Sequence, residues 1–357
     1  MDSSVQMRQK LLILDGIGGV PLGREMAEAF NAEGFETVYY DCANLPKINL
    51  YSLRAGFAKL VNRAEKKDIF YYLPKVKLGV IESILTKEKP THLLVIGFIY
   101  KFISPHLLQK MAQKANFKLY LFDTDSCNLY AKRREFVFFL EKELTIYQEI
   151  FSFSKVTTQF FKYTKNLNAS HFPFGAKSIS TPIHLAGKHD VLFVGSADLR
   201  RILLLEHIKK HVSIFGNRWQ RNYPLISAEM QSRITDNAVW GEALHQLLAE
   251  SKIVLNITRT NFYGAETGVN LRLFEALAAG CFLLTDDCEE VAALFEVGVE
   301  IEVFKNATEL KEKVAYYLAH PVEREAIAKR GHAKFLKYYT WQARILDLSR
   351  RLQLEAK

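Results

Sequence analysis

The chain has 357 residues, of which 49% are hydrophobic and 24% are charged, and its formal net charge is +9. This length exceeds one ordinary hydrophobic core and suits two α/β domains, while the composition excludes a disordered chain. No apolar run approaches the roughly 20 residues that span a bilayer, and no small-residue cleavage site follows the N-terminus, so we expect a cytoplasmic protein without a secretory signal.

The first half of the chain alternates short apolar runs with helical patterns. Leu11 to Leu14 form an apolar run before a glycine-rich loop, a helical pattern follows, and Thr37 to Tyr40 form a second strand. Further strands are expected at 92–97, 118–122, 146–151 and 170–173, and helices at 78–86, 105–115 and 156–163. Near-continuous apolar strands separated by helices predict a parallel sheet covered on both faces.

The segment 173–188 is rich in Gly, Pro, Ser and Thr and lacks periodicity, which predicts an interdomain linker. The alternation then restarts, with strands at 190–195, 212–216, 253–256, 282–285 and 300–304, and helices at 199–211, 242–249 and 271–279. Three terminal helices follow; Pro321 suits the first position of the second, and Thr340 suits the cap of the last. The pattern predicts a second Rossmann-like domain.

The charge and the cysteines restrict the partners. An excess of positive charge suits nucleotide diphosphates, acidic glycans or an acidic membrane surface, so peripheral membrane association is one possible interpretation. A solvated basic surface without a specific partner explains the charge equally. The basic residues are dispersed and not interleaved with aromatics, so nucleic acid is not expected. The four cysteines are scattered without a C-x-x-C, and no Cys/His cluster occurs, so we expect reduced thiols and no metal ligands.

The loop at residues 15–21 resembles a phosphate-binding or dinucleotide turn. Pro21 stands where G-x-G-x-x-G has its third glycine, and Asp41 is a poor fit to the acidic residue expected after it, so NAD binding is disfavoured. We expect Gly18 and Gly19 to line a cleft and let a donor approach the backbone closely.

The most informative segment runs from Gly264 to Asp287. A glycine-containing loop opens a helix whose first turns carry Asn270, Arg272 and Glu275. Free N–H groups and the dipole at a helix N-terminus attract a diphosphate, Arg272 can add a charge-assisted contact, and Glu275 can accept bonds from ribose hydroxyls. An amphipathic helix with a solvated Arg–Glu pair is the alternative interpretation.

This segment resembles the donor-binding signature of GT-B glycosyltransferases, particularly the CgeB-like (spore maturation protein) branch of the group 1 glycosyl transferases, which reads approximately G-x-N-x-R-x-F-E-x-x-A-x-G. The matching residues are Gly268, Asn270, Arg272, Phe274, Glu275, Ala278 and Gly280, followed by Asp286 and Asp287. The similarity covers 190–345 well and the N-terminal half only loosely. It implies a GT-B fold, in which two Rossmann-like domains face each other across a cleft.

The resemblance also implies roles for individual residues. Glu275 would hold the ribose, and Asn270 and Arg272 would serve the diphosphate together with Gly268 and Val269. Gly195 and Ser196 would lie near the phosphates, where Arg200 or Arg201 could neutralise charge. The wider retaining pattern, E-x7-E, puts Thr267 where a glutamate is expected, and Glu266 lies one place early. Either a loop shift restores Glu266 to this position or Thr267 replaces the glutamate. Glu266 is our candidate catalytic residue at the donor sugar, and the stereochemical outcome stays open.

Asp123-Thr124-Asp125 follows a predicted strand and matches D-x-D, which another glycosyltransferase fold uses for a metal. Because this tripeptide is common, we do not expect a metal here. We expect Asp123 and Asp125 to line the acceptor side, as a base or as an acceptor of sugar hydroxyls; two solvated turn aspartates are the alternative.

The residues and the resemblance together predict a hexosyltransferase-like glycosyltransferase that uses a nucleoside-diphosphate sugar as co-substrate, with no other cofactor. The resemblance implies that no metal is needed, and likeness to the wider group favours retention of configuration over inversion. The predicted domains are an acceptor-side domain (1–175), a linker (176–189), a donor domain (190–335) and a C-terminal helix packing back on the first domain (336–357). The acceptor would be a glycan, a protein or a lipid-linked sugar. A nucleotide-sugar epimerase or hydrolase, and a noncatalytic sugar-nucleotide-binding protein, are the alternatives.

Overall fold

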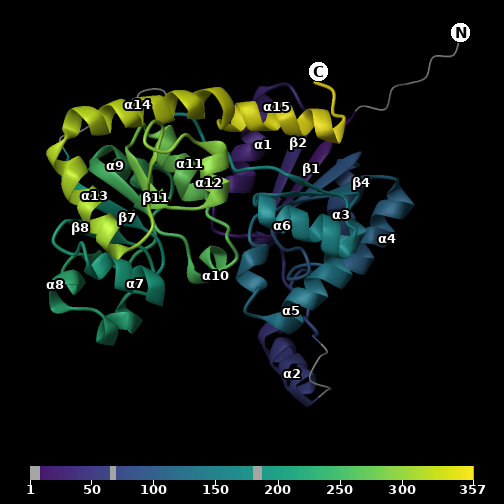
Figure 1. The fold of residues 1–357 in the computed structure, drawn as a ribbon. Coiled ribbons are helices and arrows are strands. Elements are labelled where there is room, and N and C mark those ends of the chain that lie inside the picture. The colour runs from purple at the N-terminus through teal and green to yellow at the C-terminus, as the bar shows by residue number, and fades with distance from the viewer. Residues whose placement is uncertain (1–8, 65–69, 180–186, 357) are drawn as a thin grey trace, which may run out of the picture. The chain divides into compact units, whose positions relative to one another are not determined.

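A computed structural model describes residues 9–64, 70–179 and 187–356, with side chains of 61–64 excepted (Figure 1). The contacts divide the chain into two compact units, an N-terminal unit of residues 1–172 and 345–357 and a C-terminal unit of residues 173–344. Part of the predicted linker, 180–186, lies outside the described residues.

The N-terminal unit is built on a six-stranded parallel sheet in the order β2-β1-β3-β4-β5-β6. Its strands are β1 (Leu11–Asp15), β2 (Thr37–Asp41), β3 (His92–Ile96), β4 (Lys118–Asp123), β5 (Glu149–Ser152) and β6 (Ala169–His171). Its helices are α1 (Leu22–Ala32), α2 (Tyr51–Ala64), α3 (Leu78–Glu88), α4 (Pro105–Ala115), α5 (Arg133–Phe138) and α6 (Lys155–Gln159). The sequence pattern did not reveal α2 and α5.

The C-terminal unit repeats the architecture with a six-stranded parallel sheet in the order β12-β11-β10-β7-β8-β9. Its strands are β7 (His189–Val194), β8 (Val212–Phe215), β9 (Ile234–Thr235), β10 (Ser251–Asn256), β11 (Leu283–Asp286) and β12 (Glu302–Phe304). Its helices are α7 (Leu199–Glu206), α8 (Ala228–Gln231), α9 (Gly241–Ala249), α10 (Thr260–Tyr263), α11 (Leu271–Ala278), α12 (Glu289–Leu294), α13 (Ala307–Ala319) and α14 (Pro321–Tyr338). The edge strand β9 has two residues, too few to give a pattern.

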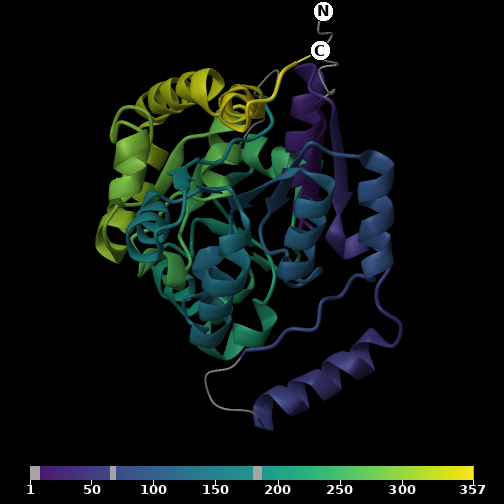
Figure 2. The ribbon, with the colours of Figure 1, turned by 90° about the vertical axis from the view of Figure 1, so that its right-hand side faces the viewer.

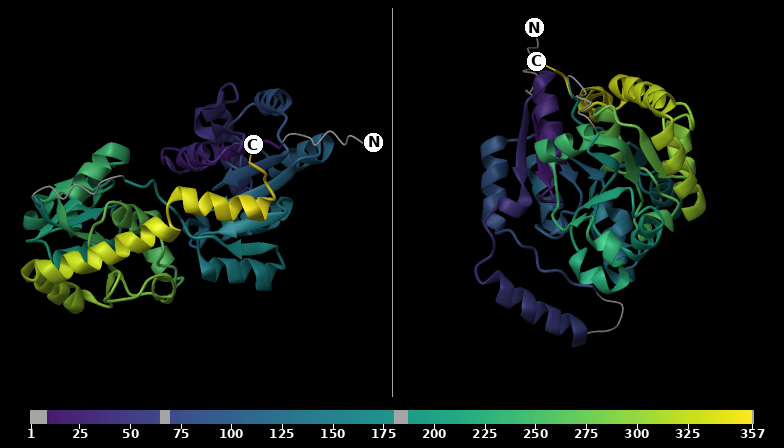
Figure 3. Two further views of the ribbon diagram at one scale, coloured as in Figure 1. Left: turned by 90° about the horizontal axis from the view of Figure 1, so that it is seen from above. Right: turned by 90° about the vertical axis from the view of Figure 1, so that its left-hand side faces the viewer.

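The last two helices follow each other closely. α14 ends at Tyr338 and α15 (Trp341–Leu352) begins after a break of two residues (Figure 3). The hydroxyl of Thr340 accepts a bond from the backbone N–H of Ala343 at 3.1 Å, which caps α15. The division into units falls inside α15, so residues 345–357 return to the N-terminal unit.

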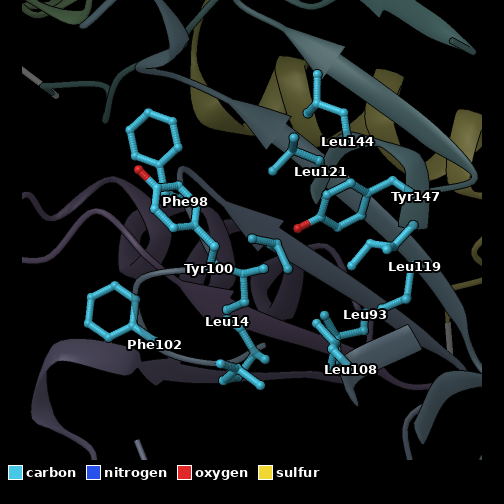
Figure 4. Close-up of a cluster of buried hydrophobic side chains, with 14 of the residues drawn as sticks. Leu14, Leu93, Phe98, Tyr100, Phe102, Leu108, Leu119, Leu121, Leu144 and Tyr147 are labelled. Carbon is cyan, nitrogen blue, oxygen red and sulfur yellow. The ribbon is translucent and has the colours of Figure 1, made fainter. Parts of the chain in front are cut away.

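Each unit has its own apolar core. In the N-terminal unit, Leu14, Leu93 and Leu121 of three neighbouring strands meet Leu108 of α4 and Tyr147 (Figure 4). The largest side chain of the C-terminal core is Trp219, which is fully buried. No helix among the described residues is both long enough and apolar enough to cross a membrane.

The strand orders give each sheet one point where the chain reverses direction across it. In the N-terminal unit the chain adds β2 on one side of β1 and then adds β3 on its other side, so the point lies between β1 and β3. In the C-terminal unit β8 is added on one side of β7 and β10 on its other side, so the point lies between β7 and β10. In open α/β sheets, ligands bind beyond the carboxyl ends of the strands at such a point. The loops after these strands are therefore where a site is expected.

Candidate active site

The segment after β10 contains the short helix α10 and then leads into α11, whose first turn is linked by two asparagines to β10 and β11. Asn270 caps α11, because its Oδ1 accepts the backbone N–H of Arg272 at 3.1 Å. Its amide also donates to Oδ1 of Asn256 at 3.0 Å, and Asn256 in turn donates to Thr285 of β11 at 2.9 Å. The N-terminus of α11 is thus held at the ends of β10 and β11.

Gly268 lies in this loop because nothing larger fits. A Cβ placed on Gly268 would lie 2.7 Å from the Cβ of Cys288 and 2.9 Å from its sulfur. The adjacent Val269 is buried. The sequence resemblance implies that both residues contact the donor. The structure shows a further reason for a glycine at position 268, which is close packing against the start of α12.

The polar side of α11 consists of Arg272 and Glu275. Five of the eight residues of this helix are buried, and these two are partly exposed. Nη1 of Arg272 lies 2.8 Å from Oε2 of Glu275, and the guanidinium lies 5.5 Å from the centre of the Trp240 ring. Buried Nε of Arg272 has no hydrogen-bond partner among the described residues. A buried donor without a partner is costly, and a bound ligand would relieve that cost.

The neighbouring pair Glu266 and Thr267 differ in accessibility. Thr267 is buried and its hydroxyl donates to the carbonyl of Phe262 at 2.9 Å, whereas the side chain of Glu266 is exposed. Glu266 also adopts φ 57°, a left-handed conformation that is unfavourable for a glutamate. Of the two residues that compete for the glutamate position of E-x7-E, only Glu266 presents a carboxylate to solvent.

Arg201 connects the loops that follow β7 and β10. Its Nε and Nη2 donate to the carbonyl of Ile257 at 2.9 and 2.7 Å, and its Nη1 donates to the carbonyl of Ser196 at 2.8 Å. Burial lowers the pKa of this guanidinium to about 10, so it stays charged at neutral pH. Gly195 follows β7 in the same loop, and its carbonyl accepts the indole N–H of Trp219 at 2.9 Å.

Arg200 faces the end of β11. Its guanidinium makes two hydrogen bonds to the carboxylate of Asp286, which is buried, and one to the carbonyl of Thr258 at 3.0 Å. The ring of Tyr263 lies 3.7 Å from the guanidinium carbon. The backbone N–H of Thr258 also donates to Asp286 at 2.6 Å. Both arginines therefore hold loops at the switch point, and their contact with a diphosphate stays a prediction.

In the N-terminal unit, the glycine-rich loop lies at the equivalent point, after β1. Gly18 and Gly19 adopt φ values of 68° and 77°, which favour glycine, and the space where a Cβ of Gly19 would lie is open. Asp15 holds the loop by accepting the N–H of Ile17 at 2.9 Å and the hydroxyl of Tyr39 at 3.1 Å. Burial raises the pKa of Asp15.

The two aspartates of the D-x-D occupy different environments. Asp123, at the end of β4, is buried and accepts the hydroxyls of Ser126 and Ser152 at 2.7 and 2.9 Å, and burial raises its pKa. Asp125 is partly exposed and accepts the amide of Asn128 at 2.7 Å. Asp123 thus joins β4 to β5, and Asp125 is the more accessible of the two.

Glu143 is a feature that the sequence did not indicate. It is buried and accepts the backbone N–H groups of Ile99 and Tyr100 at 2.9 and 2.8 Å, in the loop after β3. Burial raises the pKa of Glu143 to about 7. It comes from a π-helical segment (Phe139–Glu143), and no spacing in the sequence relates it to β3.

Comparisons with known proteins agree with this architecture. Residues 200–350 match a family described as glycosyl transferase-like. The chain is similar to a glycosyltransferase from Rickettsia africae (11% identity, TM-score 0.64, 97% of this chain and 98% of that chain). It is also similar to sucrose-phosphate synthase from Thermosynechococcus elongatus (12%, 0.67, 97% and 98%) and to Anabaena HepE in complex with UDP and glucose (13%, 0.64, 97% and 99%). No curated protein matches.

These findings confirm the predicted GT-B fold: two parallel six-stranded sheets with surrounding helices, as in the glycosyltransferases of known structure. The fold is therefore that of the GT-B glycosyltransferases, and the match to a glycosyl transferase-like family covers residues 200–350, most of which lie in the C-terminal unit. The CgeB-like branch is a finer assignment that stays a prediction.

Proposed function

We propose that the protein transfers a sugar from a nucleoside diphosphate to an acceptor hydroxyl, and that it belongs to the CgeB-like branch. The observation that carries the proposal is the Arg272–Glu275 pair beside the N-terminus of α11, at the switch point of the C-terminal sheet. A guanidinium that retains a buried, unpartnered N–H next to a carboxylate is suited to a ligand with both anionic and hydroxyl groups.

In this proposal the C-terminal unit holds the donor. The N–H groups at the start of α11, Gly268 and Val269 take the diphosphate together with Arg272, while Glu275 accepts hydrogen bonds from the ribose. Gly195 and Ser196 approach the phosphates from the loop after β7. Because Arg201 binds the carbonyls of that loop and of the loop after β10, it acts as a positioning residue for both.

The chemical step needs stabilisation of the charge that develops on the leaving diphosphate. Fixed N–H dipoles and guanidinium groups supply it, so we propose that no metal is required. Glu266 contacts the donor sugar, and we propose retention of configuration by likeness to the wider group. The N-terminal unit provides the acceptor side, with Gly18 and Gly19 toward the donor and Asp125 as the accessible carboxylate; Asp123 supports its turn.

Thermal unfolding with a panel of sugar nucleotides tests the donor site. Because Anabaena HepE was crystallised with UDP and with UDP-glucose, the uridine nucleotides come first, followed by GDP, TDP, ADP and CMP sugars. We expect one nucleotide at saturating concentration to raise the melting temperature by about 4 °C or more, and Glu275→Ala to abolish the shift. Each variant is compared with its own ligand-free melting temperature.

Asp347→Ala is the matched control, because it also removes the carboxylate of a helical ion pair, with Arg351 at 2.9 Å. It should keep the full ligand-induced shift. Equal shifts in Glu275→Ala and in the unmutated protein would refute the role of Glu275. Donor consumption without any acceptor would instead indicate an epimerase or hydrolase, and binding without turnover against an acceptor panel would indicate a noncatalytic binding protein.

A further inference from the structure

Helix α2 of the N-terminal unit exposes its large apolar side chains. Leu50, Leu53, Phe57 and Leu60 are 72%, 71%, 70% and 64% exposed. The spacing of four and three residues places Leu53, Phe57 and Leu60 in one stripe along the helix, and Leu50 immediately precedes the helix. We call these four residues the apolar stripe. Contiguous exposed apolar surface of this kind indicates an interaction site.

The opposite side of α2 is the less exposed one. Tyr51, Ala55 and Ala58 are partly buried, and the hydroxyl of Tyr51 donates to the carbonyl of Leu73 at 3.1 Å. An amphipathic surface helix normally packs its large apolar residues on the core and leaves small or polar residues outside. In α2 this arrangement is inverted, so packing within the unit does not explain the apolar stripe.

The segment that contains α2 is closed at its base by backbone contacts. Lys47 and Val76 form an antiparallel bridge, and the backbone N–H of Ile48 donates to the carbonyl of Lys75 at 2.9 Å. The chain on either side of the segment that contains α2 therefore meets at one place. Figure 2 shows α2 standing apart from the sheet of its own unit. Leu50 adopts φ 55°, an unfavourable conformation for leucine, immediately before the helix.

The charge of this segment selects the partner. Residues 45–64 contain Lys47, Arg54, Lys59 and Arg63 and no acidic residue. At about 100° per residue, Arg54 and Lys59 fall on either side of the apolar stripe, and both are exposed. A second copy of α2 packed on the stripe would bring these positive charges together, which disfavours self-association. A negatively charged surface with an apolar interior complements both features.

We propose that α2 lies in the surface of a membrane that contains anionic lipids. The apolar stripe enters the boundary between headgroups and acyl chains, and Arg54 and Lys59 contact the headgroups, as is typical of interfacial amphipathic helices. The proposal does not rest on the proposed function, because binding to a bilayer needs neither a donor nor turnover. It makes the N-terminal unit the membrane-bound part of the protein.

Vesicle sedimentation with the full chain tests the proposal. The vesicles contain phosphatidylcholine alone or phosphatidylcholine with phosphatidylglycerol. We expect binding to the anionic vesicles that weakens as salt is added, and at least about tenfold weaker partitioning of the variant Leu53→Ser/Phe57→Ser/Leu60→Ser. The charge variant Arg54→Glu/Lys59→Glu keeps the stripe and should also lose binding to the anionic vesicles.

The matched control is Tyr163→Ser/Val322→Ser/Leu336→Ser, which removes three exposed apolar side chains elsewhere and should bind as the unmutated protein does. Far-ultraviolet circular dichroism checks that each variant is folded. Equal binding of the stripe variant and the control would refute the proposal, as would absence of binding to anionic vesicles. A stripe-dependent change of sedimentation coefficient in solution without vesicle binding would show that a second copy covers the stripe.

Discussion

Glu143 shows how one buried carboxylate organises a loop at the end of a strand. It accepts two backbone N–H groups from the loop after β3 and the hydroxyl of Tyr147 at 3.3 Å. These bonds favour the charged form, but burial outweighs them and raises the pKa from its ordinary value of 4.5 to about 7. The group therefore titrates near neutral pH in the folded protein and near pH 4.5 in the unfolded chain.

We expect the stability of the N-terminal unit to depend on Glu143 between about pH 4.5 and pH 7. The folded state binds the proton of Glu143 more tightly than the unfolded chain does, so this contribution to the free energy of unfolding is fully present below pH 4.5. It is lost as the pH rises through about 7, which lowers the free energy of unfolding by about 3 kcal/mol. Glu143→Gln should remove this part of the pH dependence. Hydrogen exchange of β1 to β6 peptides at pH 5 and pH 8, corrected for the intrinsic rate, measures it; parallel profiles would contradict the prediction.

Among the predicted site residues, the structure separates those that hold their own loop from those with an accessible side chain. Asp123 is surrounded by serine hydroxyls, whereas Asp125 keeps an accessible side chain. Thr267 bonds its own loop, whereas Glu266 is exposed. A tripeptide such as D-x-D, or a one-residue offset in a motif, does not distinguish these cases, because the distinction depends on hydrogen-bond partners from other parts of the chain.

At the scale of the element, the N-terminal cap of α11 also links this short helix to the sheet. Asn270 both caps the helix and donates to Asn256 of β10. Asn306 caps α13 in the same manner, accepting the N–H of Glu309 at 3.0 Å, in an exposed position. The two asparagines thus share the capping function but differ in their link to the sheet.

We expect Asn270→Ala to lower the free energy of unfolding of the C-terminal unit by about 2 kcal/mol, because it removes a cap and leaves the side-chain Oδ1 of buried Asn256 without this donor. The control Asn306→Ala should lower it by about 1 kcal/mol. Tryptophan fluorescence in a urea titration reports this unit, because Trp219, Trp240 and Trp341 all lie in it. Equal losses would show that the Asn256 link contributes no stability.

At the scale of the whole molecule, the chain returns to its first unit through α15. Ile345, Leu348 and Leu352 are fully buried and belong to the N-terminal unit, although the C-terminal unit precedes them in the chain. Gln9 donates to the carbonyl of Gln353 at 3.1 Å, close to the start of β1. The last residues of the sequence therefore stabilise the unit that contains the first strand.

We expect Leu348→Ala to destabilise the N-terminal unit by about 2–5 kcal/mol through the cavity it leaves. Leu244→Ala, at a fully buried position of α9, is the matched control and should destabilise the C-terminal unit by a similar amount. Hydrogen exchange of β1 to β6 should accelerate in the first variant, and that of β7 to β12 in the second. The reverse pattern would contradict the division into these units.

The sequence by itself determined the two parallel sheets, because buried strands, helical periodicity and turn residues are local patterns that need no knowledge of the partners. It also located the glycine-containing segment that begins α11. The tertiary structure alone decided that Arg201 binds the carbonyls of Ser196 and Ile257, that Glu143 holds the loop after β3, and that α2 turns its apolar stripe outward. The physical reason is that burial and long-range hydrogen bonds depend on which loops the strand order brings together, and that order is not written in any local spacing.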